Sequence, residues 1–299
     1  LSIEVANQNG SQLILANDPD ADRLAAAEKL PNGQWQLLTG NQIGILLGHY
    51  MFTRWSRQHV SSDVSKVAMC ASAVSSKMLA KIAEVEGFRF EQTLTGFKWL
   101  GNRSLDLRAQ GYDVVFAYEE ALGYCVGDIA VDKDGISAGC IFAEMAIELA
   151  HEGKTVFQHM NSLYERYGEF VSNNSYVICR DPAKIDAIFA RLRNNGQYWE
   201  AVAGVQIVRI RDVTTGYTSE PTPSGLPATP DSHMIMYDFS NGVSCTLRTS
   251  GTEPKIKYYA EIAGEPGQSR EQVTQLLDAF VEDIVREMLQ PEGNGLERP

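Results

Sequence analysis

Residues 12–24 of the chain read QLILANDPDADRL, a short apolar run followed at once by an acidic loop. The run Leu13–Ala16 predicts a buried strand, because it is too short and ends too abruptly for a helix. Pro19 ends the strand, since proline fixes its own φ and disfavours helix at the residue before it. The loop carries three aspartates at alternate positions and a closing arginine: Asp18, Asp20, Asp22 and Arg23.

The acidic loop has the chemistry of a metal site. Carboxylate oxygens are hard ligands, and three of them from one tight loop suit Mg²⁺, with positions left open for a phosphate oxygen. An EF-hand loop would need glycine at position six and glutamate at position twelve, where this chain has Arg23 and Lys29. A solvated acidic turn is the alternative and would explain two isolated aspartates better. Three aspartates and an arginine directly after a strand favour a loop that binds metal and phosphate.

The composition is that of a soluble globular protein. The chain has 299 residues, enough for two domains and part of a third. Hydrophobic residues make up 44% and charged residues 21%, and no apolar run approaches membrane-spanning length. The net charge of −12 disfavours nucleic acid and anionic membrane as partners, because both bind basic surfaces. An anionic substrate would need a cleft that concentrates arginine and lysine.

The cysteines indicate a reducing compartment. They are odd in number and scattered, and most lie in apolar runs: Cys70, Cys125, Cys140, Cys179 and Cys245. This pattern predicts buried reduced thiols and a cytoplasmic protein. The chain begins at Leu1 without signal-peptide features. Because a lone strand cannot form a sheet, residues 1–40 are expected to be the C-terminal remnant of a domain.

The middle of the sequence alternates predicted strands and helices. Apolar runs predict strands at residues 66–71, 88–94 and 112–118, and periodic segments predict helices at residues 42–55, 75–86, 99–109, 139–151 and 156–167. In the second helix, Met78, Leu79, Ile82 and Val85 are expected to face the core. We therefore expect an α/β domain over residues 41–168, with a mainly parallel sheet covered by helices on both faces. Ligands in such sheets bind at the carboxyl ends of the strands.

A smaller α+β domain with an antiparallel sheet is expected over residues 169–290. Strands are predicted at residues 174–179, 206–211, 234–239, 243–248 and 255–262, and helices at residues 182–193 and 269–289. Asn241-Gly242 predicts a hairpin turn, and Ser269 with Gln272 forms a capping box. Residues 214–231 are rich in Thr, Ser, Gly and Pro and predict a long loop, and residues 291–299 a polar, frayed tail.

Two loops at predicted strand ends carry polar groups suited to a sugar. TLTGFKW at residues 93–99 has a glycine turn at a strand end and a cation beside an aromatic ring, although a plain glycine turn before a helix is the usual explanation of such a stretch. FAYEEALG at residues 116–123 sets Glu119 and Glu120 at the end of an apolar strand, where desolvation is costly unless they bind something. Sugar hydroxyls would satisfy both carboxylates; capping or solvated glutamates are the alternative.

Two further motifs lie downstream. DKDG at residues 132–135 is a charged turn by sequence alone. RTSGTEPKIK at residues 248–257 combines a guanidinium, hydroxyls and free amides that can surround a dianionic phosphate. Lys257 lies two residues into the next predicted strand and can return to the same side. An ordinary turn is the alternative, but this density of phosphate-binding groups is unusual in an acidic protein.

The motifs resemble, in type and order, those of the α-D-phosphohexomutases, the phosphoglucomutase/phosphomannomutase superfamily. The acidic loop is similar to the family's metal loop, residues 93–99 and 116–123 to its sugar loops, and residues 248–257 to its phosphate-binding loop. The resemblance runs from about Leu13 to Leu289. Ala121 departs from it, because many members carry serine there, so one sugar contact is missing. The Glu-Glu-Ala-Leu-Gly-Tyr variant resembles the branch of phosphoglucomutases and phosphopentomutases.

The resemblance implies an isomerase that transfers phosphate within the sugar, with one Mg²⁺ per active site and a sugar bisphosphate as activator or intermediate. It implies metal binding by Asp18, Asp20 and Asp22, and catalytic roles for Lys133, as general acid/base, and Arg23. Such a role would require a lowered pKa at Lys133. Implied substrate-binding residues are Thr95, Gly96, Lys98, Glu119, Glu120, Arg248, Ser250, Gly251, Thr252 and Lys257.

One family motif is missing from the sequence. Members transfer phosphate through a phosphoserine in a Thr-Ala-Ser-His-Asn-Pro-like loop, and Ala71–Ser76 lacks the histidine and the Asn-Pro pair. We therefore expect the C-terminal part of a mutase, inactive by itself: residues 1–40 from domain 2, 41–168 as domain 3, 169–290 as domain 4 and 291–299 as a tail.

Several functions remain compatible with this pattern. Interconversion of glucose 1-phosphate and glucose 6-phosphate is preferred, and mannose or pentose phosphates are alternatives. A non-catalytic module that binds phosphosugar or metal is an alternative of another class. The expected partners are a phosphosugar and the N-terminal domains of the same protein, with the oligomeric state left open.

Overall fold

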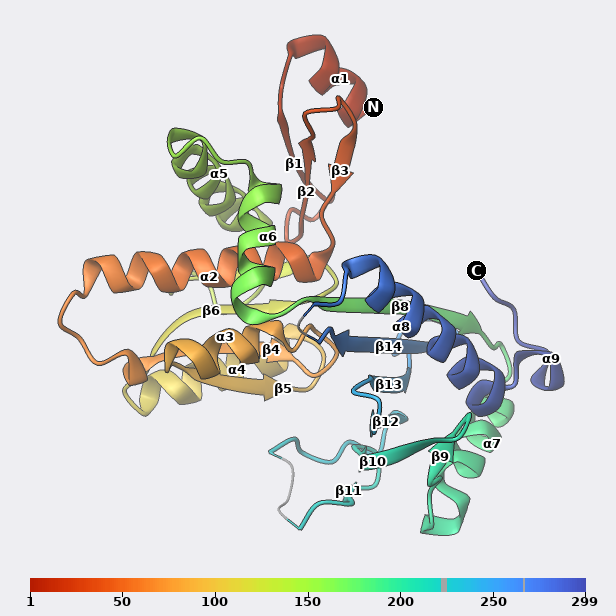
Figure 1. The fold of residues 1–299 in the computed structure, drawn as a ribbon. Helices are drawn as coiled ribbons and strands as arrows, with labels where there is room; N and C mark the ends of the chain where they lie inside the picture. Colours follow the sequence, from red (N-terminus) through yellow and green to blue (C-terminus); the bar gives the residue numbers. More distant parts are fainter. Residues whose placement is uncertain (222–224, 266) are drawn as a thin grey trace. The chain divides into compact units, whose positions relative to one another are not determined.

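The strands of the chain form three sheets, which Figure 1 shows in a computed structural model that describes residues 1–221, 225–265 and 267–299. The chain divides into two units, Leu1–Tyr167 and Gly168–Pro299. The centre of the predicted loop 214–231 lies outside the described residues, at 222–224. No helix in the described ranges has the length and apolar character needed to cross a membrane.

The first sheet is antiparallel and follows helix α1 (Ser2–Asn9). Its strands are β1 (Leu13–Asn17), β2 (Leu24–Lys29) and β3 (Trp35–Leu37), in that order. The predicted strand is therefore not alone, because it pairs with the strand that follows it. The acidic loop is the hairpin connection between β1 and β2, and the positive φ of Ala21, 58°, lets this short loop reverse the chain.

The second sheet has the order β5-β4-β6-β7. Its strands are β4 (Val67–Ser72), β5 (Arg89–Thr93), β6 (Asp113–Glu119) and β7 (Gly123–Val126). The first three pair in parallel, which confirms the predicted mainly parallel sheet, and β7 pairs antiparallel to β6. The sequence interpretation missed β7, because four residues give too short a pattern to distinguish a strand from a loop.

Helices cover both faces of this sheet. On one face, Gly48 of α2 lies against Phe116 of β6 and Leu79 of α3. On the other, Leu100 and Leu107 of α4 share a core with Ala117 of β6. The helices of this unit are α2 (Gly40–Gln58), the short η1 (Val64–Lys66), α3 (Met78–Glu86), α4 (Phe97–Ala109), α5 (Gly135–His151) and α6 (Val156–Tyr167).

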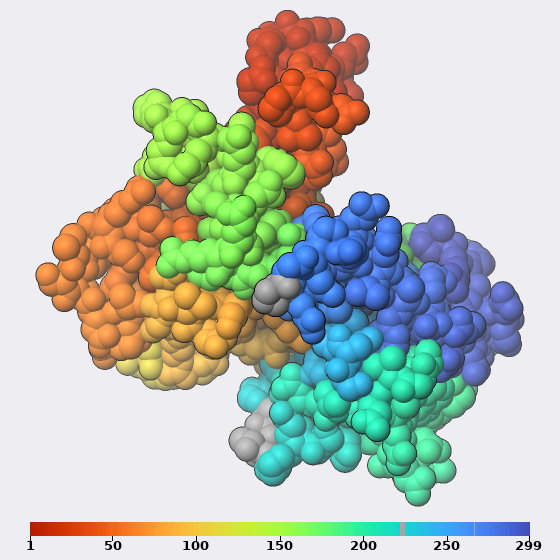
Figure 2. Space-filling model, viewed as in Figure 1, coloured from red at the N-terminus to blue at the C-terminus, as the bar shows by residue number. Residues whose placement is uncertain are grey.

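Most predicted core positions of these helices are buried, with one exception. Met78, Leu79 and Ile82 of α3 are buried as expected, but Val85 is 50% exposed, so its predicted inward orientation is wrong. Val85 lies in the last turn of α3, one residue before the end of the helix. Helices α5 and α6, green in Figure 2, form part of the outer surface, where Ile136 and Ile147 are exposed.

The third sheet belongs to the second unit and is antiparallel throughout. Its path is β11-β10-β12-β13-β14-β8, and β9 pairs with β10. The strands are β8 (Phe170–Ile178), β9 (Ala201–Val202), β10 (Val205–Asp212), β11 (Tyr217–Thr218), β12 (Met234–Phe239), β13 (Ser244–Thr249) and β14 (Lys255–Ala263). The predicted antiparallel α+β architecture is confirmed, although the expected loop 214–231 contains the short strand β11.

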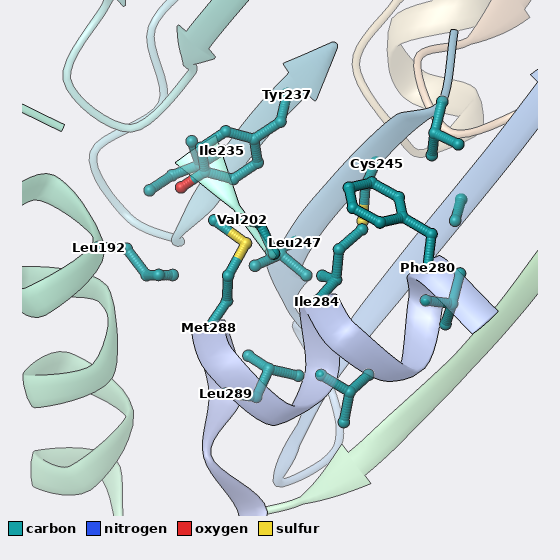
Figure 3. Close-up of a cluster of buried hydrophobic side chains, with 14 of the residues drawn as sticks. Leu192, Val202, Ile235, Tyr237, Cys245, Leu247, Phe280, Ile284, Met288 and Leu289 are labelled. Carbon is teal, nitrogen blue, oxygen red and sulfur yellow. The ribbon is translucent and has the colours of Figure 1, made fainter. Parts of the chain in front are cut away.

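The helices of the second unit pack on this sheet around one apolar core. They are α7 (Pro182–Arg193), η2 (Asn194–Gly196), α8 (Arg270–Ile284), its continuation η3 (Val285–Leu289) and α9 (Pro291–Asn294). Figure 3 shows Ile284 and Met288 directed at Leu247 and Ile235 of the sheet.

The C-terminal residues are ordered rather than frayed. Leu296 is only 9% exposed, and the Ile178 amide donates to the Glu297 carbonyl at 2.8 Å. The tail is polar in composition, but this backbone pairing and the buried leucine attach it to β8. The prediction of a frayed tail is therefore wrong. All five cysteines are free thiols, and four of them are buried, as expected for most of them, whereas Cys140 is exposed.

Candidate active site

Four segments meet at the carboxyl ends of the strands in the first unit. They are the acidic loop, the two predicted sugar loops and the DKDG segment at the start of α5. The acidic loop joins the turn after β6 through backbone pairing of Arg23 with Gly123, and the Leu24 amide donates to the Leu122 carbonyl at 3.1 Å. The Gly135 amide donates to the Ala21 carbonyl at 3.1 Å. These contacts place the aspartates beside the predicted sugar loop and the start of α5.

The acidic loop is held by its own polar groups. Asp18 accepts from the Arg23 amide at 3.2 Å, and Asn17 Nδ2 donates to the Arg23 carbonyl at 2.7 Å. The Arg23 guanidinium lies 3.9 Å from carboxylate oxygens of both Asp18 and Asp22, with half of its side chain exposed. Arg23 is therefore accessible to an anion placed over the loop. Asn17, which the sequence interpretation did not single out, orders the loop from its first residue.

The side chain of Lys133 contacts the acidic loop. Its Nζ is 2.7 Å from Asp22 Oδ2, and it lies 6.0 Å from the centroid of the Phe97 ring. The hydrogen bond from Lys133 lowers the pKa of the Asp22 carboxyl, and the same bond raises the pKa of Lys133. The geometry thus brings the predicted acid/base residue to the predicted metal loop, but it favours the protonated ammonium, the opposite of the direction that a general base needs.

The two sugar loops are joined to each other by Glu119. Its Oε1 accepts a hydrogen bond from the Gly96 amide at 2.6 Å. Thr95 is half-buried and Lys98 exposed, with its Nζ 5.5 Å from the Trp99 ring. The carboxylate and the glycine loop therefore lie at one edge of the sheet, as the strand ends predicted.

The Glu120 carboxylate contacts two serine hydroxyls to which the sequence interpretation gave no role. Its Oε2 is 3.3 Å from Ser72 Oγ and 3.5 Å from Ser75 Oγ, and its amide donates to Ser75 Oγ at 3.1 Å. A Cβ at Gly40 would lie 1.8 Å from the Glu120 carbonyl oxygen, so only glycine fits there. The serines at the end of β4 and in the turn after it are visible in the sequence. The sequence alone does not reveal which carboxylate their hydroxyls contact.

The acidic loop meets some requirements of a metal site and not others. Among residues 1–221, 225–265 and 267–299, no three His, Cys, Asp or Glu side chains lie close enough together to hold a metal ion. Two features nevertheless fit a hard cation: three carboxylates share one short loop, and the buried Asp22 Oδ1 has no hydrogen-bond partner in the described chain. The donor set therefore suits Mg²⁺, provided that the carboxylates move together.

The phosphate-binding motif lies in the second unit, between β13 and β14. Arg248 and Lys257 are directly opposite each other in the antiparallel register, so both side chains project from the same face. Neither has a carboxylate within ion-pair distance in the parts of the chain that the structure describes. The buried Arg248 Nε has no hydrogen-bond partner there, although Nη2 lies 3.3 Å from Tyr259 Oη. Two opposed cations repel each other, and an anion between them would remove that cost.

The residues between these strands form an exposed turn. Ser250 is half-buried, Gly251 and Thr252 are exposed, and the Ser250 amide donates to the Lys255 carbonyl at 3.0 Å. The five predicted phosphate-binding residues therefore share one strand–turn–strand unit. The first unit brings together the predicted residues of the metal and sugar loops, and the second unit brings together those of the phosphate loop.

Comparison with known proteins shows which family the chain resembles. Residues 39–167 match a family model described as phosphoglucomutase/phosphomannomutase, alpha/beta/alpha domain III. The chain is 46% identical to glucose 1,6-bisphosphate synthase and 45% identical to phosphopentomutase, both from Homo sapiens. Each alignment covers 99% of the chain, but 49% and 50% of those relatives. The chain thus spans about half the length of the curated relatives it matches.

Solved structures of mutases share the fold. The chain matches the open form of the Paramecium phosphoglucomutase parafusin with a TM-score of 0.67 at 20% identity, over 97% of this chain and 47% of that one. It also matches Aspergillus fumigatus N-acetylphosphoglucosamine mutase, solved with GlcNAc-6P and magnesium, with a TM-score of 0.50 at 16% identity, over 90% and 51% of the two chains. The chain belongs to the phosphoglucomutase/phosphomannomutase family of phosphosugar mutases.

Proposed function

We propose that the chain supplies the metal-, sugar- and phosphate-binding parts of a Mg²⁺-dependent mutase that interconverts hexose 1-phosphate and hexose 6-phosphate, with glucose phosphates preferred. The observation that carries the proposal is the joining of the acidic loop, both sugar loops and Lys133 at one edge of a sheet. Named relatives that make glucose 1,6-bisphosphate or act on pentose phosphates support the class of substrate.

The acidic loop would hold the metal. Asp18, Asp20 and Asp22 are the candidate ligands, and a magnesium ion there would act as a Lewis acid toward a phosphoryl oxygen. Arg23 reaches over the same loop and would neutralise phosphate charge. Lys133 Nζ, held protonated by Asp22, would donate a proton to a sugar or phosphate oxygen.

The sugar loops would orient the ring. A carboxylate offers about four acceptor positions on two oxygens, so Glu119 can accept from a sugar hydroxyl as well as from the Gly96 amide. Glu120 is ordered in the same way by Ser72 and Ser75. Thr95 and Lys98 add a hydroxyl and a cation at the same edge. These groups bind and orient the substrate and do not themselves break a bond.

The phosphate loop would hold the phosphate that is not reacting. Arg248 and Lys257 supply charge, Ser250 and Thr252 supply hydroxyls, and Gly251 allows backbone amides to approach the anion. The opposed cations support this role, because without an anion they only repel.

A pentose phosphate is the second candidate substrate. The two relatives differ by one percentage point of identity, 46% for the bisphosphate synthase and 45% for the phosphopentomutase, which does not separate hexose from pentose. A mannose phosphate, and a non-catalytic binding module, are further alternatives. Each of these alternatives uses the phosphate loop, so the experiment that tests this loop comes first.

The test is calorimetric titration of glucose 1,6-bisphosphate into the 299-residue chain. Arg248→Ala removes charge-assisted hydrogen bonds of roughly 1.5–3 kcal/mol, and binding should weaken by about ten- to hundredfold. Arg286→Ala is the matched control, because that exposed arginine pairs with Asp283 on a helix of the same unit. Equal affinity of the wild type and Arg248→Ala would remove the phosphate loop from the proposal.

A further inference from the structure

We propose that His233 is a positioning residue that holds the phosphate-binding loop in its binding geometry. The inference rests on the proposed function and goes beyond it, because His233 is not one of the groups that would touch the phosphate. It links the loop to a buried ion pair in the core of the second unit.

The backbone of His233 holds the loop directly. Its amide donates to Thr249 Oγ1 at 3.2 Å, and the Thr249 amide donates to its carbonyl at 2.9 Å. Thr249 stands between Arg248 and Ser250, two of the proposed phosphate-binding residues. A displacement of His233 therefore moves the loop at its N-terminal end, where Arg248 and Ser250 flank Thr249.

The side chain of His233 is fixed on three sides by α7. The imidazole stacks on Phe189 with ring centroids 4.5 Å apart. Its Nδ1 lies 3.2 Å from Arg193 Nη1, and its Nε2 lies 2.9 Å from Asp186 Oδ1. A guanidinium can only donate, so Nδ1 must be the acceptor and Nε2 must carry the proton. The contacts thus define a single tautomer of the ring.

Arg193 is itself immobilised by a buried carboxylate. Asp212 is fully buried, and its Oδ2 accepts from Arg193 Nε at 2.5 Å and from Tyr198 Oη at 2.9 Å. The Thr214 amide donates to its Oδ1 at 3.0 Å. A buried ion pair with these additional hydrogen bonds has one favourable geometry, because any shift leaves a charge unpaired. Asp212, Arg193, His233 and Thr249 therefore form a continuous connection from the core to the phosphate loop.

Two substitutions separate the contacts of the ring. His233→Asn keeps an acceptor near the position of Nδ1 and loses the donor to Asp186. His233→Gln keeps a donor near the position of Nε2 and loses the acceptor for Arg193. Titration of the 299-residue chain with glucose 1,6-bisphosphate at about pH 7.5 should show His233→Asn within about threefold of wild type and His233→Gln about tenfold weaker.

The contrast between the two variants supplies a readout that a merely structural role would not change, because both lose the ring but only His233→Asn keeps the acceptor for Arg193. Wild-type affinity in His233→Gln, or an equal loss of affinity in both variants, would overturn the inference. Absence of binding by the wild type would instead refute the proposed function. Thermal melts of both variants establish that the second unit is folded.

Discussion

At the scale of single residues, Asp22 has two competing uses. One oxygen accepts from Lys133, and the other is buried without a hydrogen-bond partner in the described part of the chain. This second oxygen lies 3.9 Å from Arg23 Nε, too far for a hydrogen bond, and a metal cation would satisfy it. The residue therefore links the proposed metal site to the proposed proton donor.

Removal of one aspartate should weaken metal binding. Asp20→Asn replaces a charged ligand with a neutral one, and we expect magnesium affinity of the chain to fall by about tenfold or more. Asp20 is exposed and has no role in the contacts that hold the loop, so the melting temperature should not change. Calorimetric titration with magnesium chloride measures the effect. Asp106→Asn, which removes an exposed carboxylate from α4, is the control, and similar magnesium affinity in both variants would contradict the prediction.

At the scale of elements, the start of α5 is packed against the acidic loop. A Cβ at Gly135 would lie 2.2 Å from the Arg23 carbonyl oxygen and 2.4 Å from Asn17 Nδ2. Four residues later, a Cβ at Gly139 would meet only Leu24 at 3.6 Å, an ordinary contact. The first glycine is therefore a packing requirement of the site, whereas the second is not.

Substitution of these two glycines by alanine should have opposite effects on the free energy of unfolding. Gly135→Ala forces the loop or the helix to move and should reduce the free energy of unfolding by about 1–3 kcal/mol. Gly139→Ala should raise it by about 0.5–1 kcal/mol, because alanine has the higher helix propensity. Urea unfolding of both variants measures the difference. Equal unfolding midpoints would show that α5 does not depend on this close approach.

The packing of α6 on α2 should respond to pH through His49. Burial lowers the pKa of His49 to about 4, and the charges of His159 and Arg166 act in the same direction. Its ring lies 5.6 Å from that of His159 and 6.0 Å from that of Tyr167. The unfolded chain binds the proton near pH 6.5, so between the two pKa values the unfolded state holds more protons.

Stability of the first unit should therefore be constant above about pH 6.5 and fall as the pH decreases toward about 4. The folded-state pKa of His49 implies a loss of about 3 kcal/mol over that window. His49→Phe keeps a buried ring without a titrating group, so its free energy of unfolding should vary less over the same range. Urea unfolding of both proteins at several pH values is the measurement, and identical slopes would contradict the prediction.

At the scale of the whole molecule, we expect binding without turnover. The sequence contains no Ser-His-Asn-Pro segment, so the chain lacks the group through which such enzymes are expected to pass phosphate. The purified 299-residue chain should bind glucose 1,6-bisphosphate but not convert glucose 1-phosphate to glucose 6-phosphate in a coupled assay. A phosphoglucomutase that contains such a serine loop is the positive control. Steady conversion by the chain alone would contradict the prediction.

Much of the architecture follows from local sequence. Strand β12 and helix α6 have the predicted bounds, and the capping box at Ser269 and the turn at Asn241-Gly242 are present. These features depend on periodicity and on side chains that bond to their own backbone within a few residues. The mainly parallel sheet and the antiparallel second unit also follow from the order of such segments.

The candidate site could be predicted only in its parts. The acidic loop, both sugar loops and the phosphate turn each have a recognisable pattern, and the register of β13 with β14 placed Lys257 opposite Arg248 as the strand spacing indicated. Strand β7, the serines at Glu120 and the network around His233 had no such pattern.

The amino-acid sequence by itself determined most of the longer elements, their approximate ends and which loops carry chemistry, because those properties depend on residues close together in the chain. Only the tertiary structure decided that Lys133 meets Asp22, that Glu119 accepts from Gly96, and that the acidic loop pairs with the turn before β7. Each contact joins segments that packing brings together from distant parts of the chain. The lowered pKa of Asp22 and the raised pKa of Lys133 depend on their mutual contact, so no local pattern of residues contains them.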